Sequence, residues 1–127
     1  MENKNPLSPH IQIYNWNVSS LVSISHRITG VINIMAAILI CFWIFFLTLG
    51  VDSYKIILFF LNSFFGKFLI IGFTWSFSFH ILSEIRQLLL DMGYGFEQKI
   101  SKISGLFVIF GSFLLSIVIY LFGRNIF

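Results

Sequence analysis

Three apolar stretches, each long enough to cross a lipid bilayer, dominate this chain. Residues 28–49 and 103–123 contain no charged side chain, and in residues 68–90 Glu84 and Arg86 lie near the end, with no acid or base before them apart from His80. A helix rises about 1.5 Å per residue, so about 20 residues cover the roughly 30 Å hydrocarbon core. We therefore expect an all-α integral membrane protein with three transmembrane helices, at about residues 28–49, 68–90 and 103–123.

The composition supports the membrane class. Of the 127 residues, 57% are hydrophobic and 10% are charged, against about 25% charged in soluble domains. So short a chain cannot bury this much apolar surface, which must face lipid or other subunits. The net charge of +3 comes from single basic residues beside the apolar stretches, as in membrane anchors, so a nucleic acid partner is not indicated.

The sequence divides into a polar N-terminal segment, residues 1–18, and a membrane-anchor domain, residues 19–127. The first helix is expected to begin near Ser19, so that its first turns, with SISHR, project from the membrane. Residues 51–67 are too short to span and should form an interfacial connector. Gly111 and Ser112 predict close helix packing.

The distribution of basic residues predicts the orientation in the membrane. Five of them are expected on the same side of the membrane as the N-terminus and three on the other side, which places the N-terminus in the cytoplasm or matrix. The two groups are Lys4, Arg27, Arg86, Lys99 and Lys102, and Lys55, Lys67 and Arg124.

A polar stripe follows one face of the second apolar helix. Its members recur at helical spacing: Ser76, His80, Glu84, Gln87 and Asp91. His80 lies about 16 Å below Asp91, where a polar face must meet protein, a cofactor or water. His80 therefore has three interpretations: a hydrogen bond to another helix, a proton relay, or a ligand to a metal or haem iron. Glu84 should be protonated or paired at this depth.

No second histidine is expected at the depth of His80. His10 and His26 are placed at the surface end, so a six-coordinate haem would need a ligand from a partner chain.

An N-terminal polar cluster marks the start of the first apolar stretch. Ser23, His26, Arg27 and Gly30 share one helical face. A lone Arg27 would be read as an anchor that reaches lipid phosphates. Together, however, the hydroxyl, imidazole and guanidinium groups fit a ligand with an apolar tail and a polar head, such as a quinone, or the anionic groups of a cofactor.

Three blocks of sequence resemble one known family. NPLSPHIQIY, SISHRITG and HILSEIRQLLLDMGYG, beginning at Asn5, Ser23 and His80, are similar to the cytochrome b membrane-anchor subunit of succinate dehydrogenase (complex II). The third block departs from the family pattern at two positions. Glu84 stands where the family usually has glycine, and Gln87 where it usually has histidine.

The resemblance implies a set of roles. His80 matches the axial ligand of haem b, with the second ligand supplied by a sister anchor subunit. Ser23 and Arg27 match residues of the ubiquinone site, and His26 and Arg27 would lie near the haem propionates. Residues of the PLSPH segment would contact the iron–sulfur subunit.

By the same resemblance, the chain is not an enzyme on its own. It is a subunit of an oxidoreductase with a sister anchor, an iron–sulfur subunit and a flavoprotein, embedded in lipid of a mitochondrial or bacterial inner membrane. The alternative is a structural anchor of the same complex that has lost haem, which Glu84 and Gln87 favour. A transporter subunit that uses the polar stripe as a pathway would leave the first two sequence blocks unexplained.

Overall fold

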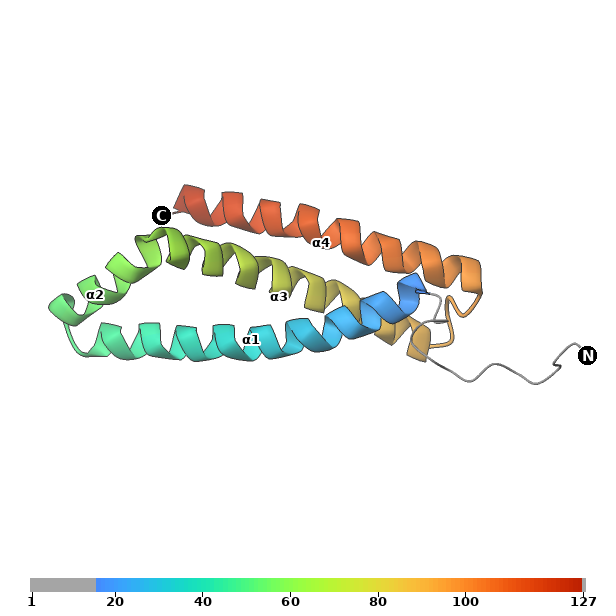
Figure 1. Ribbon diagram of the computed structural model, residues 1–127, viewed down its shortest axis with the longest axis horizontal. Coiled ribbons are helices and arrows are strands. Elements are labelled where there is room, and N and C mark those ends of the chain that lie inside the picture. The colour runs from blue at the N-terminus through green and yellow to red at the C-terminus, as the bar shows by residue number, and fades with distance from the viewer. Residues whose placement is uncertain (1–15, 127) are drawn as a thin grey trace, which may run out of the picture.

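The computed structural model describes residues 16–126, and every regular element in that part of the chain is a helix. The order is α1 (Val18–Thr48), α2 (Val51–Asn62), α3 (Phe64–Asp91) and α4 (Gln98–Ile126). Helices α1, α3 and α4 run alongside one another, and the short α2 closes one end of the bundle (Figure 1). The expected all-α class is confirmed.

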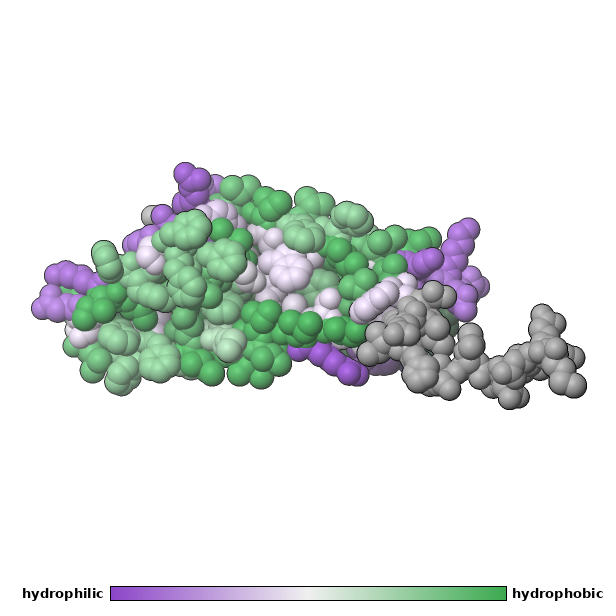
Figure 2. Space-filling model, viewed as in Figure 1, coloured by the Kyte–Doolittle hydropathy of each residue, from purple (hydrophilic) through white to green (hydrophobic). Residues whose placement is uncertain are grey.

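Three of the four helices are long and apolar enough to cross a membrane. The most apolar windows of α1, α3 and α4 have mean hydropathies of 2.5, 1.4 and 2.5. Hydrophilic residues gather at the two ends of the bundle, and the middle is largely hydrophobic (Figure 2). The chain is therefore an integral membrane protein with three transmembrane helices. Helix α3 is the least apolar of them because it carries the polar stripe.

The helices extend past the expected spans. Helix α3 begins at Phe64 and takes the last residues of the expected connector, while the rest of the connector forms α2. The turn before α2 uses Gly50 at φ 111°, a conformation that L side chains avoid. At the corner between α2 and α3, a Cβ on Gly66 would overlap the carbonyl oxygen of Phe60. Ser63 caps α3 by accepting a hydrogen bond from the Gly66 amide at 3.1 Å.

Small residues bring the long helices together. A Cβ on Gly105 of α4 would lie 2.8 Å from Cγ1 of Val18, and one on Gly111 would lie 3.2 Å from Cδ1 of Leu82. Ser112 is fully buried, so the close packing predicted at residues 111 and 112 is confirmed. In contrast, the most apolar window of α1 contains no buried residue. Helix α1 therefore leaves a long apolar face uncovered.

Candidate functional site

His26 and His80 lie against each other between α1 and α3. Their ring centroids are 4.2 Å apart and the ring planes differ by 7°. The expectation that His26 belongs to the surface end, with no second histidine at the depth of His80, was therefore wrong. His26 follows the first residue of α1 by eight positions, or about 12 Å, and His80 precedes the end of α3 by about 16 Å. Since α1 and α3 run antiparallel, the two rings reach the same level.

Glu84 joins this histidine pair from one turn further along α3. Its Oε1 lies 2.9 Å from Nε2 of His26 and 3.8 Å from Nε2 of His80. Glu84 is therefore hydrogen-bonded to His26, whereas His80 is too far away for a hydrogen bond. Glu84 was predicted to be either protonated or paired, and the pairing is confirmed, with His26 as the partner. The carboxylate is half exposed, with a side-chain exposure of 51%, so it borders open space.

Below the histidines, buried polar side chains tie α1 to α3. Thr29 is 1% exposed, and its Oγ1 lies 3.0 Å from the carbonyl oxygen of His26 and 3.3 Å from Nδ1 of His80. Ser76 Oγ lies 2.9 Å from Oδ1 of Asn33 and 3.1 Å from the carbonyl oxygen of Thr29. The inner part of the polar stripe therefore faces α1, as a polar face inside a membrane requires.

The outer part of the stripe and the N-terminal polar cluster line one cavity of about 580 Å³. Ser23, His26 and Arg27 border it from α1, and both Ser23 and Arg27 are exposed. Glu84, Gln87 and Asp91 border it from α3. Two polar faces that are distant in the sequence thus meet around one space, with His26 and Glu84 on its wall.

Arg27 has no hydrogen-bond or ion-pair partner in the part of the chain that the structure describes, residues 16–126. A guanidinium on a cavity wall, with five N–H donors that no described residue accepts from, can bind an anionic or carbonyl oxygen of a ligand. His10 and the PLSPH segment lie outside the described residues.

His80 has one ring nitrogen that could act as a haem or metal ligand. Its Nδ1 is within hydrogen-bonding distance of Thr29, which leaves Nε2 as the free nitrogen. His26 cannot be the opposite axial ligand of the same iron, because the stacked rings leave no space for a porphyrin between them. The nearest ligand atoms of His26, His80 and Glu84 lie within 4.8 Å of one another. The nitrogen lone pairs of two stacked, parallel rings point in parallel planes and do not converge on one point, however. The rings would therefore have to rotate to bind a single small ion.

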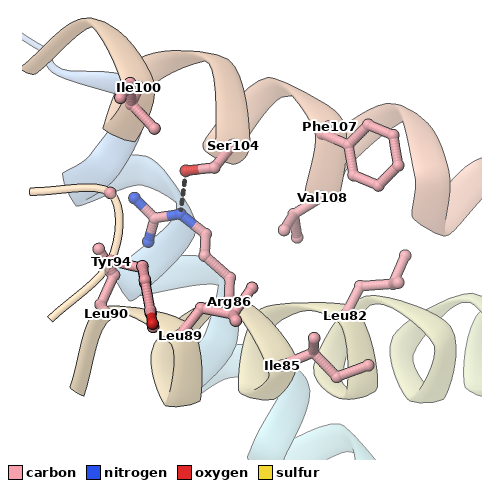
Figure 3. A pocket seen from close by; sticks show the side chains of 11 residues that line it. Leu82, Ile85, Arg86, Leu89, Leu90, Tyr94, Ile100, Ser104, Phe107 and Val108 are labelled. Carbon is pink, nitrogen blue, oxygen red and sulfur yellow. Dashed lines mark hydrogen bonds between the residues drawn. The ribbon is translucent and has the colours of Figure 1, made fainter. Parts of the chain in front are cut away.

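A second polar cluster, the serine–arginine cluster, closes the same end of the bundle. Arg86 reaches from α3 to α4, where its Nε donates to Ser104 Oγ at 3.0 Å (Figure 3). Its Nη2 donates to the hydroxyl and the carbonyl of Ser101 at 3.0 and 3.2 Å, and to Ser19 Oγ on α1 at 3.3 Å. One guanidinium therefore holds three helices together.

The serine–arginine cluster separates two cavities. Arg86 lines the polar cavity and also an apolar one of about 280 Å³ between α3 and α4, whose wall includes Leu82, Phe107 and Val108 (Figure 3).

Sequence reasoning assigned no role to Arg86 or to Thr29. Arg86 was counted as a charge that sets membrane orientation, and Thr29 was not singled out. Signals for both exist in the sequence. Thr29 lies three residues after His26 and shares its face, and Ser101 and Ser104 share a face of α4.

The chain matches the family described as succinate dehydrogenase/fumarate reductase transmembrane subunit over residues 1–119. It is 35% identical over 118 residues to the "Succinate dehydrogenase cytochrome b556 subunit" of Rickettsia felis, with 93% of this chain and 92% of the relative covered. It is 30% identical over 113 residues to the protein of the same name from Paracoccus denitrificans, with 89% and 87% covered. The "Succinate dehydrogenase cytochrome b560 subunit" of Marchantia polymorpha is 32% identical over 118 residues, with 87% and 84% covered.

These matches extend over nearly the whole chain and agree with the resemblance carried by the three sequence blocks. The same residues form three apolar helices that can cross a membrane. This chain belongs to the succinate dehydrogenase/fumarate reductase transmembrane subunit family.

Proposed function

We propose that this chain is the haem b- and ubiquinone-binding membrane anchor of a succinate:ubiquinone oxidoreductase. The observation that carries the proposal is the single cavity bordered by Ser23, His26 and Arg27, next to the inward-facing His80. Family membership supplies the type of complex. The chain does not oxidise succinate itself; it provides the membrane site where electrons from the iron–sulfur subunit reach the quinone.

The cavity has the chemistry that a quinone needs. The Ser23 hydroxyl donates a hydrogen bond to a quinone oxygen, and the Arg27 cation stabilises the negative charge that develops as the ring is reduced. Since Arg27 has no partner in residues 16–126, its donors can be given to the substrate without breaking a contact. Asp91 and Glu84 on the same wall can carry protons toward the reduced ring.

In this proposal His80 would hold the haem iron through Nε2, and the sister anchor subunit would supply a further ligand. Haem b would provide a one-electron carrier beside the quinone cavity. His26 and Arg27 lie on the cavity wall, where they can bind the propionates. Glu84 must turn away from Nε2 of His80, which its exposed side chain can do.

The partners follow from the same proposal. The uncovered apolar face of α1 fits a sister anchor subunit or lipid, because no residue of its most apolar window is buried. The iron–sulfur subunit, which carries the flavoprotein, sits at the end of the bundle that holds the cavity. That end faces the cytoplasm of a bacterium or the mitochondrial matrix, in agreement with the excess of basic residues there.

A second candidate function is a structural anchor that has lost haem. Glu84 favours it, because the carboxylate stands 3.8 Å from the nitrogen that would bind iron and is bonded to His26. The two candidates differ in the reduced-minus-oxidised visible spectrum of the purified complex. We expect a b-type α-band in the native complex and its loss in His80→Ala, with some complex still assembled. A native complex without the band, and a Glu84→Gly complex that gains it, would establish the structural anchor instead.

The quinone role is tested by comparing two electron acceptors. Arg27→Leu should lower succinate-driven quinone reduction about a hundredfold, the effect of one lost charge-stabilising donor, while reduction of a soluble dye persists. Dye reduction can use electrons before they reach the membrane site. Arg124→Leu, at the far end of α4, is the matched control and should change neither activity. If both activities of Arg27→Leu fall together with the amount of complex, Arg27 serves only as a membrane anchor.

A further inference from the structure

We propose that Thr29 is a positioning residue that fixes the tautomer of His80, so that Nε2 carries the lone pair required by iron. This inference rests on the proposed function, in which His80 is the haem ligand. It depends on the contacts of one buried hydroxyl group.

The hydroxyl of Thr29 has a single proton. Its Oγ1 donates that proton to the carbonyl oxygen of His26 at 3.0 Å, within α1. Toward Nδ1 of His80, at 3.3 Å, the same oxygen can then act only as an acceptor. With Thr29 donating to the His26 carbonyl, the proton of a neutral His80 resides on Nδ1, and Nε2 is left unprotonated.

The surroundings of Thr29 hold this arrangement in place. Thr29 is 1% exposed, so water does not compete for its hydroxyl. A Cβ on the neighbouring Gly30 would lie 3.4 Å from Cε1 of His80, which shows how closely the α1 backbone approaches the ring. The stacked ring of His26 restricts His80 further. Glu84 does not reverse the tautomer, because its Oε1 is 3.8 Å from Nε2.

A hydrogen-bond acceptor at Nδ1–H also changes the ligand itself. Histidine ligands usually donate their second ring nitrogen to an acceptor, which fixes ring orientation and raises the basicity of the ligating nitrogen. A more basic ligand favours ferric over ferrous iron. Loss of the Thr29 oxygen should therefore raise the midpoint potential of the haem.

The test is a redox titration of the haem spectrum in the whole complex. Thr29→Val keeps the shape of the side chain and removes the acceptor, so the ferrous-to-ferric ratio at a fixed ambient potential should rise about fivefold, the effect of one neutral hydrogen bond. Thr29→Ser retains the oxygen and should titrate like the native complex. Thr48→Val is the matched control, since Thr48 makes the same type of bond, to the carbonyl of Phe45, and has no hydrogen bond to a described histidine.

The outcomes separate this inference from the proposed function. An unshifted potential in Thr29→Val, with the haem band lost in His80→Ala, would overturn the inference and leave the haem assignment intact. An intact band in His80→Ala would overturn both. If Thr29→Val does not assemble, Thr29→Ala provides the same comparison, and a shift in Thr29→Ser as large as in Thr29→Ala would contradict the role of the hydroxyl oxygen.

Discussion

Arg27 and Arg86 border the same cavity, yet their surroundings are opposite. Arg86 donates hydrogen bonds to serines of α1 and α4 and is partly buried. Arg27 is exposed on the cavity wall and is not paired with any residue in 16–126. Arg86, whose donors are satisfied, holds helices together, whereas the donors of Arg27 have no partner among residues 16–126 and can bind a ligand.

The difference has an energetic basis. A guanidinium satisfied by neutral hydroxyls and a carbonyl is costly to remove, because the partly buried groups it bonded are left without their donor. Removal of an exposed guanidinium leaves no such groups behind. Stability should therefore depend on Arg86, and ligand chemistry on Arg27.

The largest effect on stability is expected from Arg86→Leu. Loss of the hydrogen bonds to Ser101, Ser104 and Ser19 should destabilise the chain by roughly 3 kcal/mol. Quinone and dye activities should then fall in the same proportion as the complex in the membrane, unlike the split expected for Arg27→Leu. The check is the amount and thermal stability of purified complex. A stable Arg86→Leu complex that has lost only quinone reduction would reverse the roles of the two arginines.

An intermediate effect is expected from lysine at each position. Lysine retains the charge but lacks the planar fork of donors. Arg27→Lys should regain part of the quinone activity, with about a tenfold deficit remaining. Arg86→Lys should still lower thermal stability, since one ammonium group cannot reproduce the bonds to both α1 and α4. Full activity in Arg27→Lys would indicate that a simple charge, as in a membrane anchor, is sufficient there.

The smallest effects should come from two serines one turn apart on α1. Ser23→Ala removes one neutral hydrogen bond to the quinone, worth about 1 kcal/mol, and should raise the KM for quinone about fivefold without loss of complex. Ser19→Ala removes one acceptor from Arg86 and should lower stability by about 0.5–1 kcal/mol with the KM unchanged. The KM for quinone and the melting temperature of the complex, measured for both variants, separate a role in quinone binding from a role in stability. Identical KM values for native and Ser23→Ala complexes would remove Ser23 from the quinone site.

Much of this organisation could be predicted from residues taken one helix at a time. The polar stripe of α3 and the face shared by Ser23, His26 and Arg27 follow from helical spacing alone. Residue spacing within one helix does not determine how far two neighbouring helices are shifted along their axes relative to each other. This is why His26 was assigned to the surface end, although its ring stacks on that of His80. For the same reason, the role of Arg86 in holding three helices together could not be predicted before its serine partners were placed.

The sequence by itself determined that the chain lies in a membrane, because uninterrupted apolar length is a local property that lipid selects directly. It also determined the face on which each polar residue lies. The tertiary structure alone decided which faces meet and at what depth. Those choices depend on close contacts such as Gly105 against Val18 and Gly111 against Leu82. Such contacts set the distance and offset between helices, and thereby bring Thr29 to His80 and Arg86 to its serines.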